Sequence, residues 1–286
     1  MILITGAGGK TGKAVIKALV ARGASARAFV RSAANEAALT ALGVSEVVAG
    51  AMDDAQALSR AVKGVDAIYH ICPNVNPHEV PFAKALIAAA NDLGVSQLVY
   101  HSVLHPQIEA MPHHWNKLRV EEMLFSSALD ITILQPTAYM QNSLAEWERM
   151  KRDGLYRVPY PIETPLSLVD LDDVSEAAAV VLTNGGHSGA NYELVGTPPL
   201  NQIEIAETFG RALKKTIRAE AESIESWDRR ARSAGMDDYQ RKTLIKMFRA
   251  YARDGLKANA NVLSWLLGRP PTSLTSFATR SAAAQA

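Results

Sequence analysis

Short apolar runs bounded by turn residues alternate with longer segments whose apolar positions lie three and four residues apart, as is typical of buried strands separated by helices. The predicted strands are Ile2 to Ile4, Ser25 to Val30, Val44 to Ala49, Ala67 to Ile71, Gln97 to His101 and Ile131 to Leu134. The predicted helices are Lys13 to Val20, Ala55 to Val62, Phe82 to Leu93 and His114 to Ser127. Strands joined in this way pair in parallel through right-handed crossovers. The pattern therefore predicts an α/β fold with a doubly wound parallel sheet covered on both faces.

The pattern changes after Pro136. Gly154 to Pro165 contains three prolines and two tyrosines without periodicity and is predicted to be a loop. A short strand, a helix and another strand are predicted at Leu166 to Val169, Val174 to Leu182 and Asn191 to Val195. From Gln202 on, only helices are predicted, over Gln202 to Leu213, Ile224 to Ser233 and Asp237 to Leu256, before a frayed tail at Ser281 to Ala286.

A glycine-rich turn joins the first predicted strand to the first helix, with the sequence Thr5-Gly6-Ala7-Gly8-Gly9-Lys10-Thr11-Gly12. Gly6 allows a sharp turn, Gly9 allows the backbone to approach a pyrophosphate, and Gly12 allows the helix to pack close to the strand. The N–H groups at the positive end of the helix would bind the pyrophosphate. Because the turn lies between a strand and a helix, it predicts a dinucleotide site.

Composition and charge exclude several other classes. With 48% hydrophobic residues the chain can bury a large core. A net charge of +1 gives no field that would attract nucleic acid or an anionic membrane, so neither is an expected partner. The single cysteine, Cys72, excludes an intramolecular disulfide framework, and the seven histidines lack the spacing of a metal site. No leader-like segment begins the chain, and we expect a protein of the reducing cytoplasm.

Several further segments, taken in order, resemble one family. They are Phe29 to Ser32, Gly50 to Asp54, Gly64 to Pro73, Leu98 to Val103, Ile133 to Asn142, Val169 to Leu182 and Gly268 to Phe277. Together with the glycine turn they resemble the NmrA-like group of atypical short-chain dehydrogenases/reductases. That group includes NAD(P)H-dependent quinone and triphenylmethane-dye reductases as well as non-enzymatic redox-sensing regulators. The resemblance implies an NAD(P)-binding Rossmann domain over residues 1–142, to which 166–182 return, and a smaller, mainly helical substrate lobe over 143–286.

The residue that ends the second strand indicates which cofactor binds. An acid at this position binds the ribose 2′-hydroxyl of NAD, whereas an arginine accommodates the 2′-phosphate of NADP. Arg31 occupies the position, and Lys10 is a second candidate cation. The sequence therefore favours NADPH over NADH, although a solvated charge at a strand end is the alternative interpretation of Arg31.

The resemblance implies the remaining cofactor contacts. Asp53 would accept from the adenine amine, although Asp53 and Asp54 also stand where a helix N-cap belongs. The nicotinamide ribose would pass Ile71, Cys72 and Pro73, and Cys72 is equally typical of a small buried apolar residue. The full predicted cofactor-binding set is Thr5, Gly6, Gly8, Gly9, Lys10, Thr11, Gly12, Arg31, Met52, Asp53, Ile71, Cys72, Pro73, Ser102, Lys117 and Pro136.

The catalytic pattern departs from that of short-chain reductases, which use a serine and a Tyr-x-x-x-Lys pair. Ser102 and Lys117 match the serine and the lysine, but His113 stands where the tyrosine belongs. Residues four apart share a helix face, so His113 and Lys117 would meet if the helix already begins at His113. His113 and Tyr139 are therefore the candidate proton donors, while Lys117 could instead pair only with Glu121.

The missing tyrosine favours an acceptor whose reduced form is already stabilised. Reduction of an aliphatic ketone needs a proton donor, whereas a quinone or a conjugated dye gives a far more stable product. The apolar walls of the substrate site are predicted to include Val75, Tyr139, Met140, Tyr156, Tyr160, Trp227 and Phe248, with Tyr156 to Pro165 as a lid. The alternative is a non-enzymatic NADP(H) sensor that acts through a protein partner. The oligomeric state stays open, a homodimer included.

Overall fold

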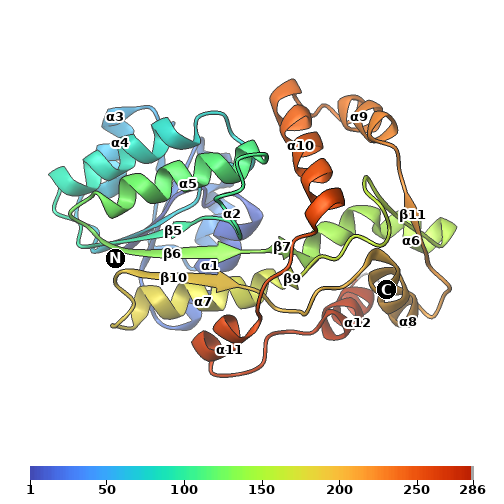
Figure 1. Ribbon diagram of the computed structural model, residues 1–286. Helices are drawn as coiled ribbons and strands as arrows, with labels where there is room; N and C mark the ends of the chain where they lie inside the picture. Colours follow the sequence, from blue (N-terminus) through green and yellow to red (C-terminus); the bar gives the residue numbers. More distant parts are fainter. Residues whose placement is uncertain (285–286) are drawn as a thin grey trace. The chain divides into compact units, whose positions relative to one another are not determined.

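A computed structural model describes residues 1–284 of the chain (Figure 1). The main sheet has seven strands, in the order β10-β6-β5-β4-β1-β2-β3. Their bounds are β1 (Ile2–Ile4), β2 (Ala26–Val30), β3 (Glu46–Ala49), β4 (Ala67–His70), β5 (Gln97–His101), β6 (Asp130–Pro136) and β10 (Ala190–Leu194). The pairs from β3 across to β6 are parallel, which confirms the predicted doubly wound sheet.

Helices cover both faces of this sheet (Figure 1). One face carries α3 (Ala55–Val62), α4 (Glu79–Asp92) and α5 (Pro112–Phe125), whose apolar side chains share a core with those of β1, β4, β5 and β6. The other face carries α1 (Lys10–Ala21) and α7 (Leu171–Thr183). The short segments η1 (Ala33–Asn35) and α2 (Glu36–Thr40) connect β2 to β3.

The strand order places a switch point between β1 and β4. The chain leaves β1 to build the sheet in one direction through β2 and β3, and then returns to build it in the other direction from β4. The loops after β1 and β4 therefore diverge at the carboxyl edge of the sheet. Open α/β sheets bind their ligands in this crevice.

The chain divides into two compact units. The first holds 1–109, 113–135 and 174–192, and includes almost the whole main sheet. The second holds 110–112, 136–173 and the described chain from Glu193 on. Of the segment 166–182, residues from Val174 on thus belong to the first unit, and those before it to the second.

The second unit combines two small sheets with helices. β7 (Ala138–Tyr139) pairs with β9 (Leu168–Val169), and β8 (Leu155–Val158) pairs in parallel with β11 (Arg218–Ala221). The helical elements are η2 (Met140–Glu146), α6 (Trp147–Asp153), α8 (Gln202–Leu213), α9 (Ile224–Ser233), α10 (Asp238–Asp254), α11 (Asn261–Leu267) and α12 (Leu274–Ala284).

Three sequence predictions in this unit were wrong. Gly154 to Pro165 is not all loop, because it contains β8, and the chain after Gln202 is not all helical, because it contains β11. The two strands form by pairing with each other across a long stretch of sequence, which local periodicity does not report. The tail is also not frayed as far as Ala284, which is still in α12, while residues 285–286 lie outside the described part.

Buried carboxylates hold the C-terminal segment in place within the second unit. Asp173, which is fully buried, accepts from the Arg269 guanidinium at 2.8 Å and from the backbone N–H and hydroxyl of Thr272. Asp170 accepts from Arg280 of α12 at 2.6 Å. The family-like segment Gly268 to Phe277 is therefore fixed by charge-assisted hydrogen bonds.

Candidate active site

The glycine turn has a geometry that only glycine allows at two of its positions. Gly6 has φ +60°, and a Cβ there would lie 2.8 Å from the Ile71 carbonyl oxygen, at the end of β4. A Cβ on Gly12 would lie 2.5 Å from the Gly6 oxygen and 2.6 Å from Ala7 Cα. Both contacts are with backbone, which has little freedom to move away. The turn is therefore fixed by close packing of α1 onto the end of β1.

Gly9 has a different environment. It is the N-cap of α1 in an extended conformation, and a Cβ there would meet only the Gly6 oxygen, at 3.3 Å. Its outer side is exposed, and the first N–H groups of α1 follow directly. Exposed backbone at the positive end of a helix suits a pyrophosphate, so these residues fit the predicted dinucleotide.

Thr5 links the glycine turn to β4. Its buried hydroxyl lies 2.9 Å from His70 Nδ1, accepts from the Ile71 N–H at 2.9 Å and lies 3.1 Å from the Ile71 oxygen. These hydrogen bonds fix the ends of β1 and β4 together at the switch point. The Thr5 side chain thus points into the protein and orders the turn.

The other predicted cofactor residues of the first unit lie along the same carboxyl edge. Arg31 directly follows β2 and is exposed, as is Lys10. Asp54 is the N-cap of α3, accepting from the N–H groups of Gln56 and Ala57, which leaves the exposed Asp53 free of that role. Gly8 and Thr11 are half-buried in the turn, and Met52 packs on the core, while Ile71 and Cys72 are buried and Pro73 is exposed.

Lys117 is almost completely buried, with 5% of its surface exposed. Its ammonium donates to Glu79 Oε1 and to the His101 carbonyl oxygen, each at 2.9 Å, and lies 3.5 Å from the Tyr100 hydroxyl. Tyr100 in turn donates to Glu79 Oε1 at 2.8 Å. Lysine, carboxylate and tyrosine thus form one buried network at the end of β5.

The alternative in which Lys117 pairs with Glu121 was wrong. Glu121 instead accepts from the Ser102 hydroxyl and from the Gln135 amide. Burial raises the pKa of the Glu121 carboxyl above its ordinary value. The two glutamates therefore have separate partners, one holding the lysine and the other holding the serine.

Sequence reasoning missed Glu79 and Tyr100. A glutamate in the first turn of a helix is commonly explained by the helix dipole, and a tyrosine inside a strand is commonly explained by packing. The available signal was positional, because Glu79 follows the loop after β4 and Tyr100 directly precedes His101 at the end of β5. Both residues therefore lie near the edge where the switch point places a ligand site.

The histidines around Lys117 are uncharged at neutral pH. Because α5 begins at Pro112, His113 and Lys117 lie on the same helix, one turn apart. Burial, with the nearby Lys117 ammonium, lowers the pKa of His113 to about 3 and that of His101 to about 3. Burial also lowers the pKa of His70 to about 4. None of these three rings therefore carries an imidazolium proton at neutral pH.

Cys72 is expected to resist alkylation in the folded protein. Burial and the nearby Glu79 carboxylate raise the pKa of the thiol far above its ordinary value, and 5% of the residue is exposed. Because the thiolate is the reactive form, iodoacetamide should modify native Cys72 at least about a hundredfold more slowly than the unfolded chain. Mass spectrometry of a time course measures both rates, and equal rates in the two states would contradict the prediction.

The remaining predicted residues lie in different parts of the chain. Pro136, Tyr139 and the buried Met140 belong to the second unit, and Val75 belongs to the first, where its φ of +49° is strained for a β-branched residue. Within the second unit, Tyr160 and Trp227 both contact Phe248, with ring centroids 6.1 and 4.8 Å apart. Three of the predicted wall residues thus form one aromatic cluster.

Tyr156 is not part of that cluster. It lies in β8, is buried, and packs against Phe209 with ring centroids 6.5 Å apart. The start of the predicted lid, Tyr156 to Pro165, is therefore a buried strand and not a loop.

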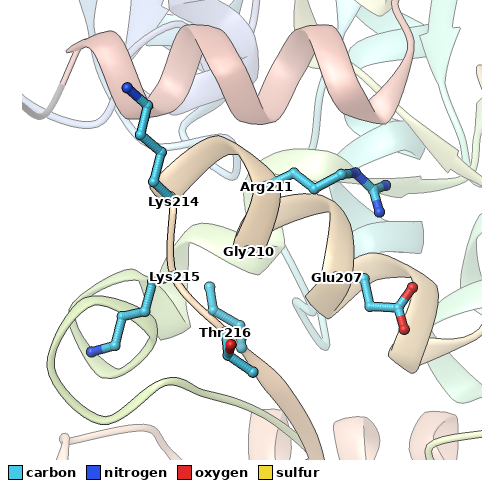
Figure 2. Close-up of a pocket in the computed structure, with 7 residues that line it drawn as sticks. Glu207, Gly210, Arg211, Lys214, Lys215 and Thr216 are labelled. Atoms are coloured by element: carbon cyan, nitrogen blue, oxygen red, sulfur yellow. The ribbon is translucent and has the colours of Figure 1, made fainter.

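A shallow hollow of about 430 Å³ lies at the carboxyl end of α8 in the second unit. In Figure 2 the side chains of Arg211, Lys214 and Lys215 diverge from one another and do not converge on a point. Lys215 donates to the carbonyl oxygens of Lys151 and Arg152, at 2.6 and 3.1 Å, near the end of α6. Of the three cations, Lys215 thus satisfies carbonyl groups at the end of α6, while Arg211 donates to the Thr208 hydroxyl.

Two other classes of site do not occur in residues 1–284. In that range no group of three or more histidine, cysteine, aspartate or glutamate side chains is arranged to hold a metal ion. Nor does any helix in it combine the length and the apolar character that crossing a bilayer requires.

Comparison with known proteins identifies the family. The model of the NmrA-like family matches residues 1–278, so the chain belongs to this family and the predicted resemblance is confirmed. The chain is 29% identical to the NAD(P)H azoreductase of Xenophilus azovorans, with 99% of each chain covered. It is 28% identical to quinone oxidoreductase 2 of Escherichia coli strain K12, with 96% of each chain covered.

Solved structures agree with this assignment. The NADPH complex of the Escherichia coli NADPH-dependent quinone oxidoreductase superimposes with a TM-score of 0.87 at 27% identity, covering 98% of this chain and 99% of that one. NmrA, a negative transcriptional regulator solved in complex with NAD, gives a TM-score of 0.83 at 17% identity, covering 99% and 95%. The second likeness is at the level of the fold alone.

Proposed function

We propose that this protein transfers hydride from NADPH to a quinone-like or conjugated aromatic acceptor. The coarser class, an NAD(P)H-dependent oxidoreductase, is that of its relatives, the azoreductase and quinone oxidoreductase 2, which are similar over nearly the whole chain. The cofactor supplies the hydride when bound. The chain supplies a turn that fits the pyrophosphate and a buried lysine near the carboxyl edge of the same sheet.

The observation that carries the choice of acceptor is the state of the groups around Lys117. The His113 ring is neutral at neutral pH, and the Tyr100 and Ser102 hydroxyls donate to buried glutamates. These three groups therefore offer little help in protonating an alkoxide. A reduced quinone or dye needs no such help, because its charge is delocalised and solvent can protonate it. Tyr139 stays a proposed proton donor.

Ser102 and Lys117 are proposed to act mainly by position. The Ser102 N–H donates to the Leu134 carbonyl at 2.8 Å, which ties the end of β5 to β6. Lys117 is fixed to the His101 carbonyl of the same strand. With both groups held by backbone, the site can orient the cofactor and the acceptor, and orientation alone lowers the barrier substantially.

A panel of acceptors tests this function. The protein is mixed with NADPH and with quinones, azo and triphenylmethane dyes or aliphatic ketones, and the oxidation of the cofactor is followed by absorbance. We expect kcat/KM for the best quinone or dye to exceed that for the ketones by at least about a hundredfold, or roughly 3 kcal/mol. Preference for a ketone would contradict the proposal. Tight NADPH binding with no turnover of any acceptor would favour the NADP(H) sensor instead.

Arg31 is proposed to select NADPH over NADH. Replacing Arg31 with alanine removes the proposed charge-assisted hydrogen bonds to the 2′-phosphate, and should raise the Kd for NADPH by about 10- to 100-fold while leaving that for NADH unchanged. Titration with both cofactors measures the change. Arg60→Ala, which removes an exposed arginine from α3, is the control and should alter neither value. An unchanged NADPH affinity in Arg31→Ala would contradict the role.

A further inference from the structure

Glu79 has an environment that structural stability alone does not explain. The residue is completely buried, and both of its hydrogen-bond donors, Tyr100 and Lys117, reach the same oxygen, Oε1. The other oxygen, Oε2, has no hydrogen-bond partner among residues 1–284. A buried carboxylate with one unsatisfied oxygen is costly, and an apolar pair would commonly stabilise a fold as well as a buried ion pair does.

The contacts of Lys117 show what the carboxylate does. An ammonium has three N–H donors, and here they reach Glu79 Oε1 and the His101 carbonyl oxygen, each at 2.9 Å, and the Tyr100 hydroxyl at 3.5 Å. The ammonium also lies 5.0 Å from the centre of the Tyr100 ring. Glu79 is thus the only carboxylate that the described structure pairs with Lys117, and it fixes both the charge and the direction of the side chain.

The Tyr100 hydroxyl strengthens this arrangement as a second donor to the same carboxylate oxygen. Because it donates to Glu79, it does not act as the tyrosine of a Tyr-x-x-x-Lys pair, and it has no exposed surface. Its ring lies beside the ion pair, with its centre 5.0 Å from the Lys117 ammonium. Glu79 lies in α4, Lys117 in α5 and Tyr100 in β5, so three elements together position one ammonium.

We propose that Glu79 is a positioning residue for the cofactor, which keeps Lys117 charged and oriented for binding NADPH. The proposal rests on the proposed function, in which Lys117 contacts the cofactor. It assigns the ordering of Lys117 to a carboxylate at the start of α4, and not to Glu121, which the sequence offered only as an alternative partner of the lysine.

The other titratable groups around Lys117 make this testable by pH. They are His70 on β4, Cys72 after it, Tyr100 and His101 on β5, and His113, His114 and Glu121 on α5. Burial lowers the pKa of each histidine to about 3 or 4 and raises the pKa values of the thiol and the phenol. None of the histidines, the thiol or the phenol therefore titrates between about pH 7 and pH 9.

The experiment measures the Kd for NADPH by titration between about pH 7 and pH 9 in wild type and in Glu79→Gln. Without the carboxylate, burial disfavours the charged ammonium, which then releases its proton more readily. We expect the Kd of Glu79→Gln to be about tenfold higher at neutral pH and to rise further as the pH increases, while wild type stays flat. The thermal midpoint of each variant is measured alongside.

A control variant removes another buried glutamate that pairs with a basic side chain. Glu222 in the second unit pairs with Arg230 at 2.6 Å, and its side chain is 3% exposed. Glu222→Gln should reduce stability without creating a new alkaline dependence of NADPH binding.

In a Lys117→Met background, Glu79→Gln should leave the Kd unchanged, because its effect acts through the lysine. If Glu79→Gln alone does not fold, the test uses Lys117→Met with and without Glu79→Gln, together with Tyr100→Phe. We expect Tyr100→Phe to raise the Kd about threefold.

The outcomes separate this proposal from the function on which it rests. If wild type does not bind NADPH, the proposed function fails. If wild type binds NADPH and Glu79→Gln binds it equally well, more tightly, or with a flat pH profile, only the role of Glu79 fails. A new alkaline dependence in Glu222→Gln would also overturn the role, because the effect would then follow from destabilisation.

Discussion

Replacing Gly12 with alanine is expected to lower the free energy of unfolding by about 3 kcal/mol and to weaken NADPH binding at least about a hundredfold. The new Cβ would lie 2.5 Å from the Gly6 carbonyl oxygen and 2.6 Å from Ala7 Cα. Since both are backbone atoms of the turn itself, relief requires α1 to move away from β1. The turn that is proposed to bind the pyrophosphate would move with it.

Denaturant unfolding and NADPH titration measure the two effects of this change. Gly185→Ala is the matched control, because Gly185 has an ordinary backbone conformation and a Cβ there would meet nothing within 4 Å. The control should unfold like wild type and bind NADPH equally well. Wild-type stability in Gly12→Ala would show that α1 does not pack against the turn as described.

The second large effect is loss of stability in mild acid. Burial lowers the pKa values of His70 and His114 to about 4 and those of His101 and His113 to about 3. The folded protein favours the neutral form of each ring. The stability that depends on these neutral rings is therefore complete above the ordinary histidine pKa of about 6.5, and it is lost as the pH falls towards 3 to 4. At pH 5 each of these histidines is therefore expected to lower the free energy of unfolding by about 2 kcal/mol.

Two carboxylates modify the acid response in opposite directions. Burial raises the pKa of Glu121, so the folded protein favours the protonated carboxyl, which offsets part of the proton uptake of the four histidines on unfolding. Burial alone would raise the pKa of Glu79, but the Lys117 ammonium and His113 outweigh burial and lower this pKa. The stability that depends on the Glu79 carboxylate is therefore lost only in stronger acid. We expect the free energy of unfolding to fall by about 4 kcal/mol per pH unit near pH 5.

Urea unfolding at a series of pH values between about 7 and 5 measures this slope. His114→Gln should reduce the slope by about one proton, or 1.4 kcal/mol per pH unit, because His114 is fully buried. His78→Gln, which changes an exposed histidine at the start of α4, should leave the slope unchanged. A stability that does not vary from pH 7 to 5 would show that the buried histidines are accessible to protons in the folded protein.

The acid response and the proposed chemistry have a common cause. Several polar side chains are buried at the carboxyl ends of β4 and β5 and in the first turns of α4 and α5, at one edge of the sheet. Burial keeps the histidines neutral, and Glu79 keeps the lysine paired. Because of this burial, the site has no strong acid, which favours an acceptor that does not need one. The same burial makes the stability of the fold sensitive to pH.

Local sequence signals located the elements of the first unit well. The predicted bounds of Ala55–Val62 and Gln97–His101 agree with α3 and β5, because each is bounded by turn residues and has unbroken periodicity. The same signals failed for β8 and β11. These strands are short, and their pairing depends on residues distant in the chain, so neither segment has a strong pattern of its own.

The sequence by itself determined the family, the parallel sheet and the position of the cofactor turn. These depend on backbone requirements, such as the glycines at positions 6 and 12, and such requirements are local. Only the tertiary structure decided the partners of the buried charges: Lys117 with Glu79 and not Glu121, and Ser102 with Glu121. The physical reason is that side chains from α4, α5 and β5 meet at one edge through packing, and their spacing along the chain does not encode which of them will pair.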